Sequence, residues 1–430
     1  MDGKKVAFYT LGCRVNGYET ESFRAQFIKK GYRCVDFKSW ADVYVVNTCT
    51  VTNIADRKNR NILRRPKKIN EGAIVVATGC YAQTNFRDLE IMEDVDLVVG
   101  QKEKESIADI VDNFDQYKGR KKRFVGNAFS YEQYGEIGYA GLRDLNKAYV
   151  KIQDGCDRFC SFCKIPFARG RKRSRELTSI MEEVRGLVAN GFKEIVLIGI
   201  HLGAYGEDLS EDINFDDVVE KILDIDGVER LRVSSMYPDS ISDRFIDLMN
   251  HRKFMPHLHM SIQSGDDRVL SLMRRRYDSR LMYNVFDKIS RRVNNILFTG
   301  DVIVGFPHEE EENFQNTCNF IESFRFSDLH IFPYSDREKT LASTYDGKVE
   351  PQEKYSRFRR LDEIRRKGNL KSLLLHVGQE VEILVESVKD GIASGYTQNF
   401  LRSRIEGSNA KEGDILKFTP NLVKQGLLWG

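Results

Sequence analysis

Short apolar runs alternate with longer polar stretches along the first hundred residues of the chain. The apolar runs read KKVAFYT, VYVVNT, AIVVATG and VDLVVG. This alternation is typical of βα units arranged around a parallel sheet. We therefore predict an open parallel α/β domain over residues 1–115. The stretch 116–145, which is charged and rich in glycine, is predicted to be a linker.

A second series of the same kind follows the linker. Its six apolar runs are AYVKIQ, EIVLIGI, RLRVSS, HLHMSIQ, ILFTGDVIVGF and DLHIFPYS. Six βα repeats predict a partial (β/α)6 barrel over residues 146–368, with its active site at the carboxyl ends of the strands. Ser179 and Ser240, each followed three residues later by an acidic residue, are predicted to mark helix starts.

The chain ends in a third region with a different pattern. The basic stretch KYSRFRRLDEIRRKGNLK predicts one long helix that leaves the barrel. Beyond it, QEVEILVESV alternates apolar and polar residues with period two, and further strand-like runs are punctuated by glycines. We predict a small β-barrel over residues 369–430.

Composition argues against several classes of protein. The 430 residues carry 67 Lys and Arg against 64 Asp and Glu, a net charge of +3, and 41% are hydrophobic, which argues against global disorder. No apolar run approaches the roughly 18 residues of a membrane span, and the first residues lack the apolar stretch of a signal peptide. We expect a cytoplasmic protein with no membrane association. Its eight cysteines are too few for a disulfide scaffold and are expected to be thiols or metal ligands.

Three cysteines follow the first three apolar runs within a few residues. They are Cys13, Cys49 and Cys80. Because neighbouring strands of an open α/β sheet end at one crevice, these thiols are expected to meet there. The alternative is three unrelated core cysteines, since free cysteine is often buried. Cys34 and Cys318 follow no such pattern and are expected to be core thiols.

A second cysteine group lies on the loop after the first predicted barrel strand. In DGCDRFCSFCKIP, Cys156, Cys160 and Cys163 have the spacing C-x3-C-x2-C. A structural zinc site takes four ligands, and no fourth Cys or His stands nearby. Three thiolates fit a [4Fe–4S] cluster with one iron left open for a substrate or cofactor. An incomplete zinc knuckle and redox thiols are the alternatives.

This spacing on the first loop of a partial barrel resembles the radical S-adenosylmethionine enzymes, and nearly the whole chain resembles their methylthiotransferases. YTLGCRVNGYETE, VVNTCTVT, ATGCYAQ, HLHMSIQSGDDRVLSLMRRRY, DVIVGFP and FPYSDR carry the resemblance. It implies two [4Fe–4S] clusters, one on each cysteine triplet, and S-adenosylmethionine at the open iron of the second. It also implies that the C-terminal β module is an RNA-binding TRAM domain. Lys164, His308 and Lys339 depart from the family pattern.

Other residues at predicted strand ends are candidates for S-adenosylmethionine contacts. Glycines after the second barrel strand allow the backbone to approach a ligand closely. His201, in the same loop, is either polar lining or a structural histidine and is not assigned catalysis. The candidates are Gly199, His201, Gln263, Ser264, Asp301 and Gly305.

Basic segments border both cysteine groups. Residues 57–68 carry seven basic and no acidic side chains, and residues 169–175 carry five basic ones. Together they favour a polyanionic partner, although either alone fits a solvated face. The C-terminal module is neutral between Lys371 and Lys424 (7 − 7 = 0). Tyr396 and Phe400 there are either base-stacking surfaces or core.

The resemblance implies a tRNA methylthiotransferase, and IGIHLGAYGEDL and VSSMYPDSI are most similar to the branch that acts on N6-threonylcarbamoyladenosine beside the anticodon. The expected partners are the tRNA anticodon stem-loop, an electron donor and a sulfur donor. Isopentenyl-adenosine is the closest alternative substrate, and a ribosomal-protein aspartate is another. A non-catalytic RNA-binding metalloprotein is disfavoured, because an open iron is a poor structural site.

Overall fold

The computed structural model describes residues 3–117, 122–136 and 147–430. These residues form two compact units. The first unit combines Met1–Leu142 with two later segments, Gln153–Arg175 and Ser335–Ser343. The second contains Arg143–Ile152, Glu176–Tyr334 and Thr344–Gly430. None of the described helices is long and apolar enough to cross a membrane.

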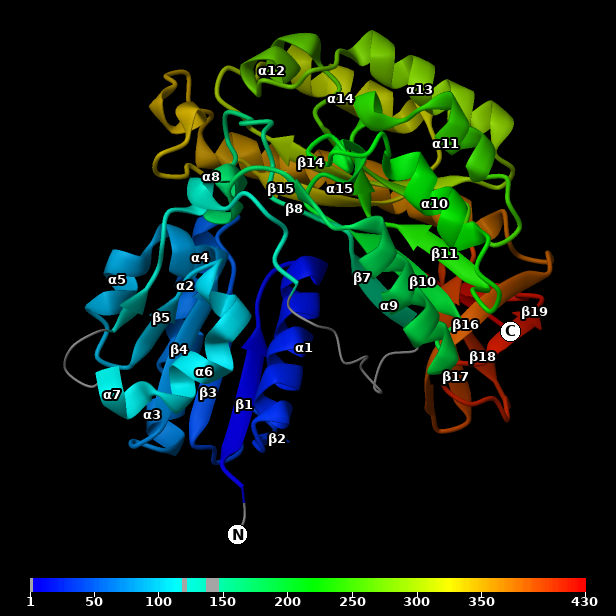
Figure 1. Cartoon of the computed structure of the whole chain (residues 1–430). Helices are drawn as coiled ribbons and strands as arrows, with labels where there is room; N and C mark the ends of the chain where they lie inside the picture. Colours follow the sequence, from blue (N-terminus) through cyan, green and yellow to red (C-terminus); the bar gives the residue numbers. More distant parts are fainter. Residues whose placement is uncertain (1–2, 118–121, 137–146) are drawn as a thin grey trace. The chain divides into compact units, whose positions relative to one another are not determined.

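A six-stranded sheet with only parallel pairings forms the centre of the first unit (Figure 1). Its order is β2-β1-β3-β4-β5-β6. The strands are β1 (Lys5–Thr10), β2 (Arg33–Val35), β3 (Val43–Thr48), β4 (Ile74–Gly79), β5 (Leu97–Val99) and β6 (Arg123–Phe124). The helices are α1 (Arg14–Lys29), α2 (Asn53–Leu63), α3 (Pro66–Ile69), α4 (Cys80–Thr84), α5 (Phe86–Glu90), α6 (Ile107–Asp112) and α7 (Phe114–Tyr117).

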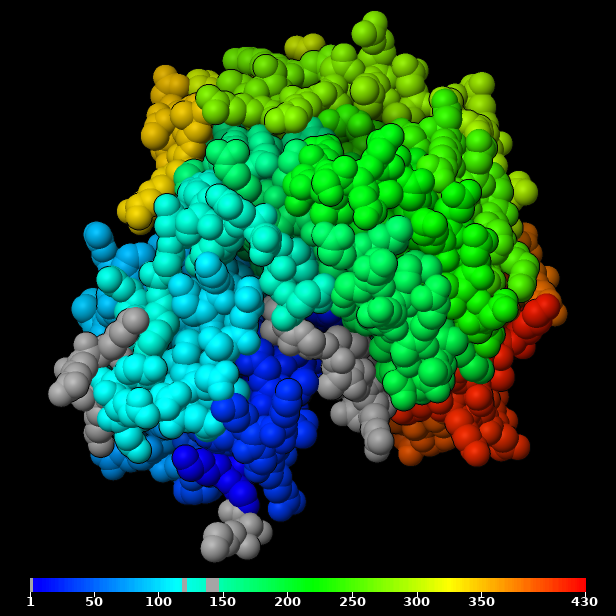
Figure 2. All heavy atoms as spheres, in the orientation of Figure 1, coloured from blue at the N-terminus to red at the C-terminus, as the bar shows by residue number. Residues whose placement is uncertain are grey.

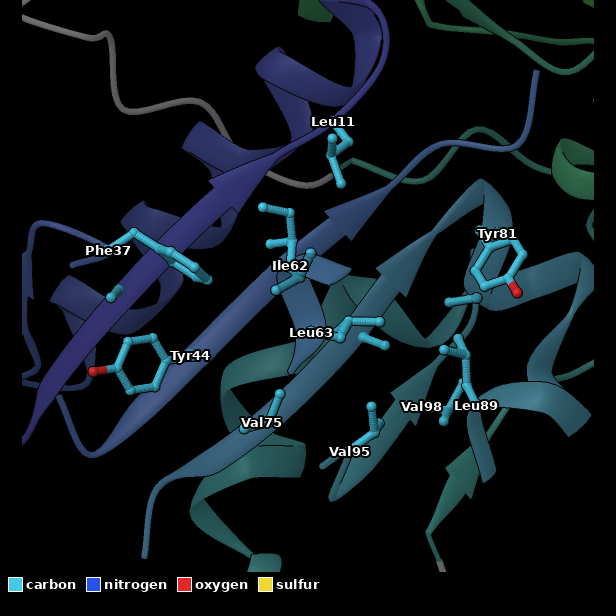
Figure 3. Packing of buried hydrophobic residues seen from close by; sticks show 14 of the residues in the cluster. Leu11, Phe37, Tyr44, Ile62, Leu63, Val75, Tyr81, Leu89, Val95 and Val98 are labelled. Atoms are coloured by element: carbon cyan, nitrogen blue, oxygen red, sulfur yellow. The ribbon is translucent and has the colours of Figure 1, made fainter. Parts of the chain in front are cut away.

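Apolar side chains cover both faces of this sheet. Alternate residues of β3 point to opposite faces, so Val43 and Val45 belong to one core and Tyr44 and Val46 to the other. One core is completed by α1 and α6, and the other by α2, α4 and α5. Figure 3 shows the second core. Burial on both faces explains the near-continuous apolar runs in the sequence.

The prediction that residues 116–145 form only a linker needs partial correction. Residues 123–124 form β6, which pairs in parallel with β5, and the Phe124 ring lies 4.9 Å from that of Tyr117. A two-residue strand has no periodic signal, so the sequence did not reveal it. The linker residues 118–121 and 137–145 lie outside the described residues.

The second unit contains two parallel sheets, ordered β11-β10-β7 and β12-β13-β14-β15. They are built from β7 (Lys147–Lys151), β10 (Glu194–Ile198), β11 (Arg230–Val233), β12 (Ser235–Met236), β13 (His257–Gln263), β14 (Leu297–Val304) and β15 (Phe326–Pro333). Each of the six runs predicted as barrel strands is a strand here. Helices follow them: α9 (Leu177–Ala189), α10 (Phe215–Leu223), α11 (Asp243–Leu248), α12 (Asp267–Leu272), α13 (Ser279–Arg292) and α14 (Glu311–Ser323). Figure 2 shows atoms of this green to yellow-green region forming a continuous outer surface.

Two predicted helix starts are wrong. The N-cap of α9 is Glu176 instead of Ser179, and α11 is capped by Ser242, whose hydroxyl accepts from the Phe245 amide. The chain turns into α9 earlier than the Ser179 pattern suggests, and Ser240 lies in a 3-10 turn. The predicted long helix is confirmed as α15 (Pro351–Leu374).

The C-terminal module is a six-stranded sheet in the order β19-β16-β17-β18-β21-β20. Its strands are β16 (Val381–Lys389), β17 (Ile392–Thr397), β18 (Arg402–Glu406), β19 (Ile415–Phe418), β20 (Leu422–Lys424) and β21 (Leu427–Trp429). Arg230 and Arg232 of β11 pair with buried Glu194 and donate to carbonyls of residues 396–398 of this module. These buried bonds attach the module to the parallel sheets within the second unit.

Candidate functional site

The first cysteine triplet lies at the carboxyl edge of the sheet in the first unit. Thr10 pairs with Asn47 and Thr48 pairs with Gly79, so β1, β3 and β4 end at the same level. Cys13 is the N-cap of α1, Cys49 follows β3, and Cys80 is the first residue of α4. Cys49 and Cys80 are buried, whereas Cys13 is exposed. The topology therefore places all three thiols at one edge of adjacent strands.

Glycines with positive φ precede two of these cysteines. Gly12 has φ +97°, and a Cβ there would lie 2.8 Å from the Sγ of Cys49. Gly79 has φ +90°, and a Cβ there would lie 2.3 Å from Asn47 Oδ1 and 2.5 Å from the Thr48 carbonyl oxygen. Any side chain at either position would force neighbouring strand ends apart.

Buried asparagines hold the loops of this triplet. Asn59 accepts from the Cys49 amide at 3.2 Å and donates to the Cys49 carbonyl at 2.6 Å. Asn16 donates to the carbonyls of Leu11 and Thr48, which precede Cys13 and Cys49. The backbone of the triplet is thus fixed independently of the thiols.

The second triplet lies in a loop of the same compact unit. The loop runs from β8 (Gln153–Asp154) to α8 (Ile165–Arg169) and β9 (Arg173–Ser174). The Cys156 amide donates to the Gly170 carbonyl at 3.1 Å. Gly155 and Gly170 both have positive φ, and a Cβ on either would lie 2.0 Å or less from a carbonyl oxygen.

Backbone amides point at two sulfur atoms of this loop. The Arg158 amide lies 3.5 Å from Cys156 Sγ, and the Ile165 amide lies 3.4 Å from Cys163 Sγ. Hydrogen bonds to cysteine sulfurs stabilise thiolate charge and tune iron–sulfur clusters. The loop therefore presents sulfur atoms suited to bind a metal cluster.

The spacing of the thiols argues against a single zinc ion. In the described part of the chain, one group of three metal-ligating side chains has all its ligand atoms within 4.8 Å, and it is His259, Asp301 and His330. Neither cysteine triplet is that tight. A tetrahedral zinc ion would hold thiolates about 3.8 Å apart, given its bonds of about 2.3 Å. In each triplet at least two sulfur atoms are therefore farther apart than a zinc ion would hold them.

Arg169 links the two cysteine loops. Its side chain is fully buried and donates to Asp154 Oδ1 at 2.9 Å, Glu19 Oε1 at 2.8 Å and Asn16 Oδ1 at 2.7 Å. Glu19 also pairs with Lys104 at 2.7 Å. Burial would lower the pKa of Arg169, but Asp154, Cys80 and Glu19 raise it well above its ordinary value, so it stays cationic. The cation ties α8 of the second loop to α1 of the first.

Burial also acts on the first triplet. It raises the pKa of the Cys80 thiol to about 12 and raises that of Cys49, and Arg169 opposes both shifts. Without metal these two thiols are protonated at neutral pH. Binding of any metal by these thiolates would therefore release protons.

The predicted S-adenosylmethionine contacts all lie in the second unit. Gly199 follows β10, Gln263 ends β13, and Gly305 follows β14, so these three stand at strand ends. The Ser264 hydroxyl is buried and lies 3.1 Å from that of Thr317, which gives it a structural partner. His201 is buried with its ring 4.7 Å from Tyr237. Asp301 lies inside β14 and faces two histidines.

The prediction that the basic segment 169–175 offers a surface to a polyanion needs correction. Arg169, Arg173 and Arg175 are buried, and Arg175 pairs with Glu136 at 2.9 Å. Arg171 is exposed, and Lys172 is partly exposed. The sequence could not show this, because the partners of Arg169 and Arg175 lie far away in the chain. Lys164 is likewise buried, with its pKa lowered by burial and its Nζ 3.4 Å from Asn85 Oδ1.

The segment 57–68 keeps its exposed cations. We call its exposed basic side chains the α2–α3 basic surface, and they are Arg57, Lys58, Arg64, Arg65 and Lys68. The two aromatic residues considered for base stacking are partly exposed and stack on other rings. Tyr396 stacks on Phe400 at 4.5 Å, and Phe400 stacks on His257 at 4.5 Å.

Sequence reasoning missed several residues that build the site. Arg337, from the FPYSDR motif, is buried and donates to Asp56 at 2.6 Å and to the Thr50 carbonyl at 2.9 Å. His308 and Lys339, noted as departures where glycine is common, both have positive φ, at +62° and +68°. The Gly-Cys pairs were visible in the sequence as a feature repeated at Cys13, Cys80 and Cys156, whereas Asn59 lies ten residues after Cys49.

Comparisons with known proteins agree with this geometry. A model described as the Radical SAM superfamily matches residues 150–321, and one described as uncharacterized protein family UPF0004 matches residues 5–100. TsrM from Kitasatospora setae, a radical S-adenosylmethionine methyltransferase, has a similar fold, with a TM-score of 0.61 and 14% identity over 79% of this chain and 77% of that one. The fold and the second cysteine loop thus define a radical S-adenosylmethionine enzyme.

Three relatives show which family of radical S-adenosylmethionine enzymes the chain belongs to. The threonylcarbamoyladenosine tRNA methylthiotransferases MtaB of Bacillus subtilis and Aquifex aeolicus are 39% and 40% identical, over 96% and 89% of this chain and 92% of each of theirs. The tRNA-2-methylthio-N(6)-dimethylallyladenosine synthase of Methylacidiphilum infernorum is 33% identical over 91% of this chain and 86% of its own. The chain belongs to the radical S-adenosylmethionine methylthiotransferase family. Membership implies a [4Fe–4S] cluster and S-adenosylmethionine.

Proposed function

We propose that this enzyme converts N6-threonylcarbamoyladenosine, next to the anticodon of tRNA, to its 2-methylthio derivative. The observation that carries the proposal is the presence of two cysteine triplets in one compact unit, joined by buried Arg169. A reaction that both activates a carbon and inserts sulfur needs two such sites close together. The MtaB relatives support the threonylcarbamoyl substrate by their higher identity.

The residues take separate roles in this proposal. Cys156, Cys160 and Cys163 hold one [4Fe–4S] cluster, and Cys13, Cys49 and Cys80 hold an auxiliary one. When bound, the first cluster would supply the electron that cleaves one S-adenosylmethionine to the radical that removes the C2 hydrogen, a second S-adenosylmethionine would supply the methyl group, and the auxiliary cluster would supply the sulfur. Arg169 keeps the two loops in register, and Asn59 holds the Cys49 backbone.

The parallel strands of the second unit form a partial barrel in this proposal. β11 ends at Val233 and β12 begins at Ser235, so one strand interrupted at Ser234 continues from one sheet into the other. The six parallel strands then follow in sequence order, with Gly199, Gln263 and Gly305 at their carboxyl ends, where barrel enzymes bind their ligands. The C-terminal sheet is the TRAM-like module.

The choice of threonylcarbamoyladenosine over isopentenyl-adenosine as the substrate does not depend on the cations of residues 169–175. Three of its arginines and Lys164 are buried, so they are poor candidates for the carboxylate of a threonylcarbamoyl group. Isopentenyl-adenosine is the alternative substrate, since a relative of that activity also covers most of the chain. The proposed reaction also requires an electron donor and a sulfur donor.

The α2–α3 basic surface is proposed to contact tRNA phosphates. The double variant Arg64→Glu/Arg65→Glu is expected to weaken tRNA binding at least tenfold at low salt and to reduce the salt dependence, because about two phosphate contacts are lost. Filter binding at several salt concentrations measures both effects. Arg33→Glu/Lys38→Glu, exposed on the same unit and equal in charge change, is the control. Equal affinity of both double variants would contradict an RNA contact at this surface.

Iron content tests the two proposed clusters. The anaerobically reconstituted chain should hold about eight irons, because each triplet takes a four-iron cluster. Replacing Cys13, Cys49 and Cys80 together by Ala should leave about four. Iron and sulfide analysis gives the count, and about four irons in both proteins would exclude the auxiliary cluster.

The proposed substrate is tested in cells. Nucleosides from tRNA of cells with and without the gene are separated by chromatography, and mass spectrometry identifies and quantifies them. Loss of the 2-methylthio derivative of threonylcarbamoyladenosine on deletion, with recovery on re-expression, is expected. Loss of the isopentenyl derivative alone would assign the alternative branch.

A further inference from the structure

One face of the sheet β12-β13-β14-β15 is polar where parallel sheets are normally apolar. Along β13, Leu258, Met260 and Ile262 are fully buried, and they alternate with polar residues. Strands of parallel sheets are usually apolar on both faces. The polar face carries His257, His259, Ser261, Thr299, Asp301 and His330. His257 is buried and stacks on Phe400, whereas His259, Asp301 and His330 are partly exposed, which indicates a binding role for their part of the face.

Three of these side chains converge on one point from three adjacent strands. His259 Nε2 lies 3.2 Å from Asp301 Oδ1, and His330 Nδ1 lies 3.2 Å from the same oxygen. All three ligand atoms lie within 4.8 Å of one another. Asp301 and His330 are direct partners in the sheet register, so the strands themselves hold the pair.

These distances match a small metal ion. An ion bound tetrahedrally at about 2.0–2.1 Å places its ligand atoms about 3.3–3.4 Å apart. The other ring nitrogen of His259, Nδ1, lies 2.8 Å from the Thr299 hydroxyl, which fixes the ring with Nε2 towards Asp301. Metal-binding histidines are typically oriented in this way by a partner on their second nitrogen.

The charge and exposure of the group also fit a metal. Burial would raise the pKa of Asp301, but hydrogen bonds from His259 and His330 bring it well below its ordinary value, so it is a carboxylate. The His330 side chain is 63% exposed, which leaves room for a further ligand on its side. Two imidazoles and one carboxylate are a ligand set used by catalytic zinc and by non-haem iron.

We propose that His259, Asp301 and His330 form a mononuclear site for a divalent transition metal of the zinc class, with an open coordination position. The site lies wholly within the second unit and uses none of the six cluster cysteines. It shares no ligand with either proposed cluster and does not depend on the proposed tRNA substrate, and it makes Asp301 a metal ligand instead of the predicted S-adenosylmethionine contact. The competing explanation is a metal-free arrangement in which both histidines donate to Asp301.

Zinc binding to the cluster-loaded enzyme distinguishes the proposed metal site from the metal-free arrangement. Protein with both clusters reconstituted is titrated anaerobically with Zn²⁺ against a chromophoric chelator, and X-ray absorption reports the zinc ligands. One zinc per chain is expected, with nitrogen and oxygen at about 2.0–2.1 Å and no sulfur at about 2.3 Å. Asp301→Asn and His330→Gln should each weaken binding more than tenfold, and Thr299→Ala should weaken it about 10–100-fold.

The controls test whether a variant is misfolded and whether zinc is bound by cysteine sulfur instead of the proposed site. His330 is largely exposed, so His330→Gln is not expected to disturb the fold, and iron content checks that the clusters survive in each variant. His251→Gln, at an exposed histidine outside the group, should bind zinc like the wild type. Zinc bound through sulfur, or equal affinity in wild type, Asp301→Asn and His330→Gln, would overturn the proposal.

Discussion

Cys156→Ala is expected to abolish cleavage of S-adenosylmethionine, whereas Cys49→Ala should retain cleavage and lose thiolation of tRNA. The first change removes a ligand of the cluster that supplies the electron. The second removes a ligand of the auxiliary cluster, and the local backbone should persist because Asn59 bonds the amide and carbonyl of residue 49. Chromatography of 5′-deoxyadenosine and mass spectrometry of nucleosides measure the two activities in one reaction.

A cysteine outside both triplets provides the control for this experiment. Cys34 is part-buried in β2 and pairs with Val6 near the start of β1, whereas Cys13 follows the end of β1. Cys34→Ala should keep both cleavage and thiolation. If Cys156→Ala and Cys49→Ala lost cleavage equally, the division of roles between the triplets would be wrong.

Arg169→Ala is expected to destabilise the first unit by about 3–5 kcal/mol, the cost of leaving buried charges without their partner. Glu19 and Asp154 would each retain a cation, Lys104 at 2.7 Å and Arg173 at 3.8 Å, but both would lose the guanidinium that they share. Iron content should also fall, because the two cysteine loops lose their link. Denaturant unfolding under anaerobic conditions and iron analysis measure the two effects.

Two further variants make this prediction specific. Arg171→Ala, at an exposed arginine two residues away, should change stability by no more than about 0.5 kcal/mol. Arg169→Lys keeps the charge but not the planar fork that reaches Asn16, Glu19 and Asp154 together, so an intermediate loss is expected. Equal stability of Arg169→Ala and Arg171→Ala would show that the buried network does not hold the loops.

Local patterns in the sequence predicted most of the strands. The four apolar runs of the first unit are β1, β3, β4 and β5, because strands buried on both faces give continuous apolar runs. The edge strands β2 and β6 were missed, since three and two residues are too few to show a pattern. The position of the first cysteine triplet followed from topology, because parallel strands end at one edge.

Long-range pairing could not be predicted in this way. Arg169 reads as part of a basic loop, yet its partner Glu19 lies 150 residues earlier in the chain. Only the fold brings that carboxylate to the guanidinium and buries both. The group of His259, Asp301 and His330 is similar, because its three members come from three strands whose register no single segment reveals.

The reaction proposed for this enzyme is the methylthiolation of threonylcarbamoyladenosine in tRNA. The most direct measurement offers the purified, reduced enzyme and S-adenosylmethionine two tRNA pools, one carrying the threonylcarbamoyl group and one carrying the isopentenyl group. The products are digested and the nucleosides are quantified by mass spectrometry. We expect a mass gain of one methylthio group on the threonylcarbamoyl nucleoside, dependent on Cys49 and Cys156. Methylthiolation of the isopentenyl pool alone, or of neither pool, would contradict it.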